Sequence, residues 1–181
     1  LTTVYAMECF GSDRYRQCNR HQPKVAHNGH FVQISAGAFH NCGLTSTGVI
    51  ECFGSDANNQ TNGGNMVSTG DGFKEVSAGE KHTCGLTTKG VIICFGSDEW
   101  GQSNAYKPVV ASTGVFTHVS VGGRHSCGLT TNGQIECFGH DGDGGQSNGH
   151  KPKTPSSGGA FTGVSAGAFH TCGVTDNGLI E

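Results

Sequence analysis

The chain has 181 residues, with 11 lysines and arginines against 14 acidic residues and a formal net charge of -3. This length suits one domain or part of a larger one, and the few, scattered basic residues argue against a nucleic-acid partner. No apolar run approaches the roughly 20 residues needed to cross a bilayer, and no charged-then-apolar leader opens the sequence. We therefore expect a soluble segment, already processed or excised, without a membrane span.

Four copies of one unit follow each other along the chain. In its first copy the unit begins FVQISAGAFHNCGLTSTG and continues VIECFGSD, and YAMECFGSD from Tyr5 is a leading partial copy. The copies begin at Phe31, Phe73, Phe116 and Phe161. A period of about 43 residues is typical of a propeller blade or a solenoid unit. Glycine supplies 31 residues, a bias typical of low-complexity chains, but apolar residues at fixed places in every copy indicate folded repeats.

Each unit is predicted to consist of β-strands, because its apolar residues alternate or cluster over short runs and do not follow helical spacing. In the first full copy we expect strands at 31–36, 40–45 and 49–53, followed by the long polar connection 55–72. The second and third strands are joined by a three-residue turn that ends in glycine, here Gly48. A three-residue hairpin needs glycine at that position, where φ is positive.

Pairs of cysteines ten positions apart flank these turns. The pairs are Cys42 and Cys52, Cys84 and Cys94, and Cys127 and Cys137. With glycine in the turn, the two members of a pair lie opposite each other with Cα atoms roughly 4.5 Å apart, within disulfide range. We predict three cross-strand disulfides, each contributing about 2 to 3 kcal/mol, and hence an oxidising compartment. Bound zinc is the alternative, although zinc ligands usually stand two to four residues apart.

Three cysteines are left over: Cys9, Cys18 and Cys172. Cys9 and Cys172 each match one member of a pair whose other member would lie beyond an end of the sequence, which is expected of a segment cut from a longer array. A bond between Cys9 and Cys172 is the alternative. Cys18 stands where the other copies have threonine or serine, and we expect a free thiol or an intermolecular bridge.

The repeated motif resembles that of a known family. Val-Ser-Ala-Gly-x-x-His-x-Cys-Gly-Leu, a turn ending in glycine, and Ile-x-Cys-Phe-Gly-Ser-Asp-x-x-Gly-Gln are similar to the repeat of the regulator of chromosome condensation family. The similarity is greatest to its cysteine-paired extracellular and bacterial branch, related to the repeat-built beta-lactamase inhibitor protein. One departure recurs: the family usually has Trp-Gly where this chain has Phe-Gly, and phenylalanine lacks the indole donor.

The resemblance implies an all-β fold, a β-propeller of about 43-residue repeats, with four repeats present as part of a larger, seven-bladed ring. We accordingly treat residues 1–181 as a single, partial propeller domain. Its repeats are a partial one at about 1–30, full ones at 31–72, 73–115 and 116–160, and a partial one at 161–181. Family members include a nucleotide exchange factor, a plant ultraviolet receptor, enzyme inhibitors and extracellular modules. The receptor depends on a tryptophan cluster, and Trp100 is the single tryptophan here. A nuclear exchange factor fits poorly with paired cysteines and a mildly acidic chain.

Two polar residue types recur once per unit. The histidines are His40, His82, His125 and His170, and the aspartates after Phe-Gly are Asp13, Asp56, Asp98 and Asp141. A metal site is the alternative for the histidines, but equivalent positions in adjacent blades are too far apart to share a ligand at about 2 Å, so we expect structural hydrogen bonds. Aspartate at the start of a loop typically caps its own backbone, so we expect turn formation and not calcium binding.

Further candidates lie in the connections. His21, His27 and His30 cluster near Pro23 and form either a weak metal site or a solvated loop. The loop aromatics Tyr15, Trp100 and Tyr106 are candidate anchors for a sugar ring or a protein partner, or else pack against a neighbouring blade. Asn59 begins an Asn-Gln-Thr sequence that fits N-glycosylation if the protein is secreted by a eukaryote.

No catalytic motif is present: there is no nucleophile elbow, phosphate loop or displayed carboxylate pair. We therefore expect a non-enzymatic, extracellular, disulfide-stapled module without cofactor or metal. We expect it to serve as a structural and interaction module in a cell-surface or filamentous assembly. It would bind a protein partner or assemble with itself. The alternative is a lectin-like glycan binder or an enzyme-inhibitor-like protein that uses the loop aromatics.

Overall fold

The structure is a computed structural model that describes residues 6–27, 29–61, 72–104, 107–142, 145, 147 and 151–181. Within these residues the helical structure is one 3-10 turn, η1 (Asn19–His21). No described helix has the length and apolarity required to span a membrane.

The rest of the regular structure is β. The strands are β1 (Ala6–Met7), β2 (Lys24–Val25), β3 (Phe31–Ala36), β4 (His40–Thr45), β5 (Ile50–Gly54), β6 (Phe73–Ala78), β7 (His82–Thr87), β8 (Ile92–Gly96), β9 (Phe116–Val121), β10 (His125–Thr130), β11 (Ile135–Gly139), β12 (Phe161–Ala166) and β13 (Thr171–Thr175). The predicted all-β fold is therefore confirmed, with the third strand of the first full copy shifted by one residue from the expected 49–53.

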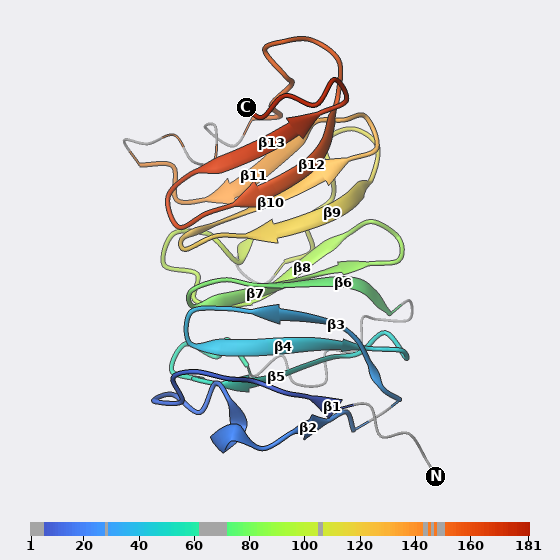
Figure 1. The fold of residues 1–181 in the computed structure, drawn as a ribbon. Helices are drawn as coiled ribbons and strands as arrows, with labels where there is room; N and C mark the ends of the chain where they lie inside the picture. The colour runs from blue at the N-terminus through green and yellow to red at the C-terminus, as the bar shows by residue number, and fades with distance from the viewer. Residues whose placement is uncertain are drawn as a thin grey trace.

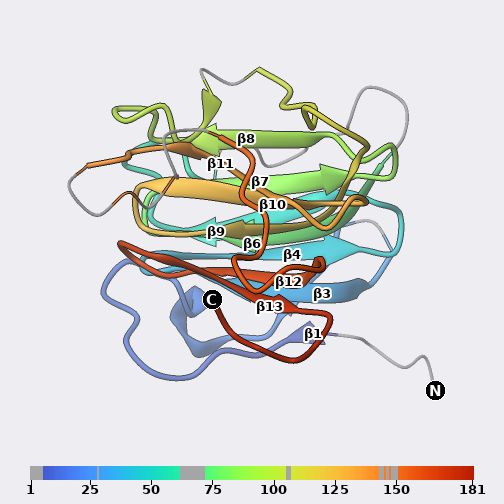
Figure 2. The ribbon, with the colours of Figure 1, turned by 90° about the horizontal axis from the view of Figure 1, so that it is seen from above.

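Each complete repeat forms one antiparallel three-stranded sheet. The sheet orders are β3-β4-β5, β6-β7-β8 and β9-β10-β11, followed by the pair β12-β13, while β1 pairs with β2. Figure 1 shows these sheets one above another, with β1 and β2 at one end and β12 and β13 at the other. Seen from above, the third strands β8 and β11 lie toward one side and the first strands β6 and β9 nearer the middle (Figure 2). This is the arrangement of successive propeller blades that do not close into a ring.

The core lies between consecutive sheets. One cluster joins Cys42, Leu44 and Ile50 of one sheet to Phe73, Val76, Ala78 and Phe95 of the next, and two equivalent clusters follow along the stack. The second strand of each complete sheet is buried along its whole length because both of its faces are covered. The glycine of the Cys-Gly-Leu segment is required for steric reasons, since a Cβ on Gly85 would collide with Ile50 and with the ring of Phe73.

The cysteine pairs lie directly opposite each other in the sheets, as the turn glycines predict. Cys42 pairs with Cys52 in register, and the turn residue Gly48 has a φ of 77°. The three cross-strand disulfides have Cα separations of 4.1, 4.0 and 4.0 Å. Each disulfide therefore ties the second strand of a complete sheet to the third.

A fourth disulfide was not predicted. Cys9 is bonded to Cys18, with Cα atoms 4.9 Å apart, so Cys18 is neither a free thiol nor an intermolecular bridge, and Cys9 is not paired with Cys172. The physical reason is the course of the loop between them: the N–H of Cys18 donates to Asp13 Oδ1 at 2.7 Å, which turns the chain back toward Cys9. Cys172 is the free cysteine and is half-buried.

Side chains of the first strands connect neighbouring sheets. The strands β3, β6, β9 and β12 contact each other in succession. Gln33 Oε1 accepts the N–H of Val76 at 2.9 Å, and at the equivalent place Glu75 Oε2 accepts the N–H of Val119 at 3.3 Å. These bonds satisfy backbone donors at the inner edge of each sheet, where no further strand pairs.

Candidate functional site

One end of the strands gathers the same two loops from every repeat. The turns between first and second strands, at 37–39, 79–81, 122–124 and 167–169, lie along the left side of Figure 1. The loops after the third strands begin at this end too, because His40 pairs with Gly54 and the other repeats share this register. We call this end the turn face: the four turns together with the loops 12–18, 55–61, 97–103 and 140–142.

Neighbouring turns are in direct backbone contact. The N–H of Ala38 donates to Gly79 O at 3.1 Å, and the N–H of Glu80 donates to Gly122 O at 3.4 Å. A Cβ on Gly79 would collide with Gly122 O, so the glycine of the Ser-Ala-Gly segment is required by this close approach. The turns line an open groove of about 360 Å³ whose walls are mainly alanine and glycine.

The centres of these turns are among the positions that differ between repeats. Each turn reads Gly-x-x-His, and the two central residues are Ala38-Phe39, Glu80-Lys81, Gly123-Arg124 and Ala168-Phe169. The residues on either side of them are nearly the same in all copies, because they form the sheets and the contacts between sheets. In repeat proteins the surface that differs from repeat to repeat is often the binding face.

Two of the predicted loop aromatics belong to the turn face. Tyr15 and Trp100 both stand two residues after the capping aspartate of their loops. Each contacts the turn of the following repeat: Tyr15 packs edge-on against Phe39 with ring centroids 5.0 Å apart, and the Arg124 guanidinium lies 5.4 Å from the Trp100 ring. Both remain exposed, at 42% and 45%. The packing against a neighbouring repeat, expected as one alternative, is therefore present for Tyr15 and Trp100. Contact with a sugar or protein partner stays a prediction, and Tyr106 lies outside the described residues.

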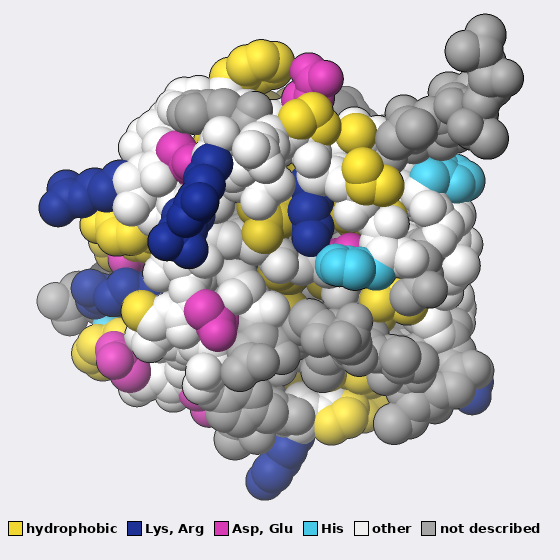
Figure 3. Space-filling model, turned by 90° about the horizontal axis from the view of Figure 1, so that it is seen from below, with side chains coloured by type: hydrophobic (Ala, Val, Ile, Leu, Met, Phe, Trp, Pro, Cys, Tyr) yellow, Lys and Arg dark blue, Asp and Glu magenta, His cyan; other side chains and the backbone are white. Residues whose placement is uncertain are grey.

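The turn face carries charges of both signs. Lys81 and Arg124 line a small cavity of about 80 Å³ together with Glu80, Glu99 and Trp100. Among the described residues, no carboxylate lies within ion-pair distance of Lys81 or Arg124. Figure 3, viewed from below with the turn face on the left, shows basic and acidic side chains projecting from that side. The face is charged but is not a continuous patch of one sign.

The recurring histidines connect repeats from inside. His40 and His82 are fully buried, with Nε2 2.7 Å from Thr83 Oγ1 and 2.9 Å from Ser126 Oγ respectively. Because Thr83 Oγ1 donates to Gln60 O at 3.1 Å, it accepts the Nε2–H of His40, while the buried Nδ1 of His40 has no hydrogen-bond partner among the described residues. Burial lowers the pKa of His40 to about 4 and that of His82 to about 3. Among the described residues there is no group of three potential ligands able to hold a metal ion.

The recurring aspartates form turns, as expected from their place in the loops. Asp56 Oδ1 accepts the N–H of Thr61 at 2.9 Å, and Asp98 Oδ1 accepts the N–H of Ser103 at 2.7 Å. Asp13 and Asp141 make the same bond in their own loops. Three of these loops make the bond across five residues and the fourth makes it across six, while the side chains of the loops differ.

Asn59 has a conformational role in its loop. It is exposed, its φ is 59°, and its N–H donates to Asp56 O at 3.0 Å. The equivalent residue of a later loop is Gly101, with a φ of 73°. Asparagine tolerates this left-handed conformation better than most residues, so its presence is explained by the turn, and its glycosylation stays a prediction.

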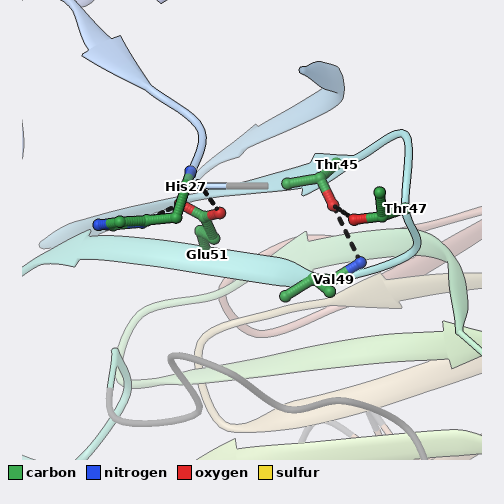
Figure 4. Close-up of polar contacts among 5 residues, drawn as sticks. All are labelled: His27, Thr45, Thr47, Val49 and Glu51. Carbon is green, nitrogen blue, oxygen red and sulfur yellow. Dashed lines mark hydrogen bonds and ion pairs between the residues drawn. The ribbon is translucent and has the colours of Figure 1, made fainter. Parts of the chain in front are cut away.

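A set of carboxylate contacts with backbone N–H groups, away from the turn face, was not predicted from the sequence. Glu51 accepts the N–H of His27 at 2.9 Å and lies 2.7 Å from its Nδ1 (Figure 4). In the same view Thr45 Oγ1 contacts Thr47 and accepts the N–H of Val49, which fixes the β4–β5 turn. Glu136 and Glu181 accept backbone N–H groups in the same way, from Ser112 and Ser156. The available signal was the recurring Ile-Glu pair in the third strand.

The histidines of the first connection, expected to form either a weak metal site or a solvated loop, have exposed members with separate contacts, at His27 and His30. The side chain of His27 contacts Glu51, and the backbone N–H of His30 donates to Ser46 Oγ at 3.3 Å. The side chain of His21 lies outside the described part of the structure.

The sequence match decides the family. Residues 31–60, 73–102 and 116–146, half of the chain, match the model of the regulator of chromosome condensation (RCC1) repeat. The chain belongs to the RCC1 repeat family. A sequence comparison with curated proteins finds no match.

Solved structures share the fold at low sequence identity. Human WBSCR16 is 18% identical with a TM-score of 0.76, over 94% of this chain and 55% of that one. A structure of Kap60 bound to yeast RCC1 (Prp20) is 20% identical with a TM-score of 0.69, over 88% and 45%. The CRINKLY WD40 ectodomain of the Arabidopsis thaliana receptor kinase ACR4 is 23% identical with a TM-score of 0.65, over 84% and 54%. The RCC1 repeats described here thus span about half the length of these chains.

Proposed function

We propose that this chain is a non-catalytic, extracellular β-propeller module, a single domain over residues 1–181, that binds a protein partner through the turn face. The observation that carries the proposal is that turns and loops of successive repeats meet on the turn face and present exposed or partly exposed aromatic and charged side chains there. The second central position of these closely spaced turns holds Phe39, Lys81, Arg124 and Phe169. A rigid scaffold that presents varied, exposed side chains is suited to recognition.

The exposed residue types favour a protein partner. Tyr15, Trp100 and Arg124 are all exposed on the turn face, and tyrosine, tryptophan and arginine are the residues enriched at the energetic centres of protein interfaces. One solved relative of the fold is a yeast RCC1 (Prp20) bound to another protein, Kap60. The adjoining groove, with alanine and glycine walls, leaves room for side chains of the partner.

An extracellular location is supported by the sulfur chemistry. Eight of the nine cysteines are in four disulfides, and such bonds persist in oxidising compartments. The ACR4 structure is an ectodomain, so the same fold serves outside the cell in that receptor. Glycosylation at Asn59 belongs to the same proposal and would add a mass removable by an N-glycosidase.

Site-directed photo-crosslinking tests the proposal. A photoreactive phenylalanine replaces Tyr15 or Phe169 on the turn face, or Lys153, which pairs with Ile135 next to the hairpin turns at the opposite end of the strands. Each protein is then exposed to the extracellular fraction of its source. We expect a saturable adduct with one protein species from Tyr15 and Phe169, and no adduct from Lys153.

The control is competition with unlabelled protein. The unmodified chain should abolish the adduct, and a chain with Tyr15→Ala and Trp100→Ala should not. Equal crosslinking from both ends, or adducts with glycans or with copies of the chain itself in place of another protein, would contradict the proposal. Those last two outcomes would favour the lectin-like and the self-assembling alternatives respectively.

A further inference from the structure

The turn face presents two cations in the middle of an aromatic row. The second variable position of the four turns holds Phe39, Lys81, Arg124 and Phe169. The close approach of neighbouring turns places these four residues in order across the stack. The aromatic members are partly exposed, and Phe169 is 61% exposed. The row therefore reads aromatic, cation, cation, aromatic.

Aromatic rings from two repeats position Arg124. Its guanidinium carbon lies 5.4 Å from the ring centroid of Trp100 and 5.9 Å from that of Phe169. Trp100 is itself held edge-on against His140, with centroids 4.5 Å apart. Contacts between a guanidinium and an aromatic ring restrict its orientation without using its N–H donors. Arg124 is therefore an exposed, pre-oriented donor.

Two acidic residues share the cavity of these cations without forming an ion pair with them in the described part of the chain. Glu80 and Glu99 line the same small cavity as Lys81 and Arg124, but within the described ranges neither carboxylate forms an ion pair with them. A carboxylate arriving from outside would find Lys81 and Arg124 outside any ion pair with the described residues, and charge-assisted hydrogen bonds to arginine are among the stronger ones. The two glutamates would repel a dense run of acids, which favours a single acid in an apolar setting.

We infer that the turn face recognises an acidic side chain of its protein partner, which binds between Lys81 and Arg124 while the apolar residues beside that acid contact Phe39 and Phe169. This inference rests on the proposed function and specifies the chemistry of the partner. In this arrangement the two cations select for the acidic side chain, and the aromatic residues at the ends of the row provide apolar contact area.

Trp100 provides a direct readout, because it is the single tryptophan of the chain and contacts Arg124. The full 181-residue chain is titrated with the tryptophan-free peptide acetyl-Gly-Ser-Phe-Glu-Phe-Ser-Gly-amide while Trp100 fluorescence is recorded. Two counterparts replace the glutamate by glutamine or by lysine. We expect a saturable change with the glutamate peptide, a Kd at least tenfold higher for the glutamine peptide, and no change with the lysine peptide.

Two variants of equal charge change locate the effect. Arg124→Gln should raise the Kd of the glutamate peptide at least tenfold. Lys153→Gln, at the exposed opposite end of the strands, should leave the Kd unchanged. Thermal unfolding of both variants checks that the fold is kept, and Arg124→Glu should gain binding of the lysine peptide.

Three outcomes would overturn the inference: equal binding of the glutamine peptide, equal weakening by the two variants, or no fluorescence change with any peptide. None of these results changes the expected outcome of the crosslinking experiment, since a partner can bind through the aromatic residues of the turn face alone. Failure of acid recognition is therefore distinguishable from failure of the protein-binding function.

Discussion

At the scale of single residues, the glycines of the turns are tightly constrained positions. Gly79 has no room for a side chain, because a Cβ would collide with Gly122 O and approach Val121 Cγ1 at 2.6 Å. The collision involves backbone of the next repeat and cannot be relieved by a side-chain rotation.

We predict that Gly79→Ala lowers the free energy of unfolding by about 2 kcal/mol or more, as forced overpacking does. Urea denaturation measures the effect. The matched control is Gly101→Asn, which should be nearly neutral because Asn59 has the same left-handed conformation at the equivalent place and nothing lies within 4 Å of a Cβ on Gly101. Equal loss in both variants would show that the close approach of the turns is not the cause.

Glu75 illustrates a residue whose charge is unfavourable where it stands. Burial raises the pKa of its carboxyl group, against smaller opposing effects of His118, the N–H of Val119 and Lys74. The equivalent residue of the preceding repeat, Gln33, makes the same bond without a charge.

Glu75→Gln should therefore raise the free energy of unfolding at pH 7. A raised carboxyl pKa means that the penalty is present above that pKa and disappears as the group is protonated on acidification. The difference between variant and parent should accordingly vanish at low pH, as measured by urea midpoints from pH 7.5 to 4. A difference that does not change with pH would contradict this explanation.

At the scale of elements, each sheet depends on its cross-strand disulfide. Removing the Cys84–Cys94 bond by Cys84→Ser with Cys94→Ser should lower the free energy of unfolding by about 2 to 3 kcal/mol, because the unfolded chain regains the freedom of a short loop. Cys172→Ser, which breaks no disulfide, should change it by less than about 0.5 kcal/mol. A comparable loss from Cys172→Ser would indicate that this thiol is bonded.

The contacts between sheets depend on neutral histidines. Burial lowers the pKa values of His40 and His82 to about 4 and about 3, and it lowers that of His125 as well, while the unfolded rings take up protons near pH 6.5. The contribution of these neutral rings to the free energy of unfolding should be fully present above about pH 6.5. It should decrease as the pH falls toward the pKa values of the folded state.

His82→Gln should reduce this pH dependence by close to one proton, which corresponds to about 1.4 kcal/mol per pH unit between pH 6 and 4. Urea denaturation at several pH values measures the slope. The variant loses some stability at neutral pH, but the slope is independent of that loss. An unchanged slope would mean that His82 is not buried and neutral in the folded chain.

The sequence was sufficient to predict the strands and three disulfides, because both follow from local rules. The turn glycine sets the register of the hairpin, and the register places Cys42 opposite Cys52. The Cys9–Cys18 bond was not predicted because it depends on the path of a loop. Ser103 and Ser147 stand at the place of Cys18 in later loops, and both are buried with their N–H groups bonded to the loop aspartate.

The turn face was predicted only in part. Tyr15 and Trp100 were identified as exposed loop aromatics, but their contacts with Phe39 and Arg124 join a loop of one repeat to a turn of the next. Such contacts follow from the way successive sheets stack, which the period of the repeat does not specify. The acceptors of the buried histidines, such as Thr83, were hidden for the same reason.

At the scale of the whole molecule, the chain combines a lightly apolar composition with a regular stack of sheets. Hydrophobic residues make up 34% of the sequence, and the core is divided into small clusters between neighbouring sheets. Covalent bonds within the repeats stabilise a stack whose separate cores are small. The sheets leave the turn face exposed, and its turns carry Phe39, Lys81, Arg124 and Phe169 at equivalent positions.

Counting free thiols by intact mass tests this account most directly. The native protein is denatured in the presence of iodoacetamide, with and without prior reduction, and the carbamidomethyl groups are counted. With eight cysteines in disulfides and Cys172 free, we expect one label without reduction and nine after it. Peptide mapping should then join Cys42 to Cys52, Cys84 to Cys94 and Cys127 to Cys137. Nine labels without reduction, or bonds between different repeats, would contradict the account.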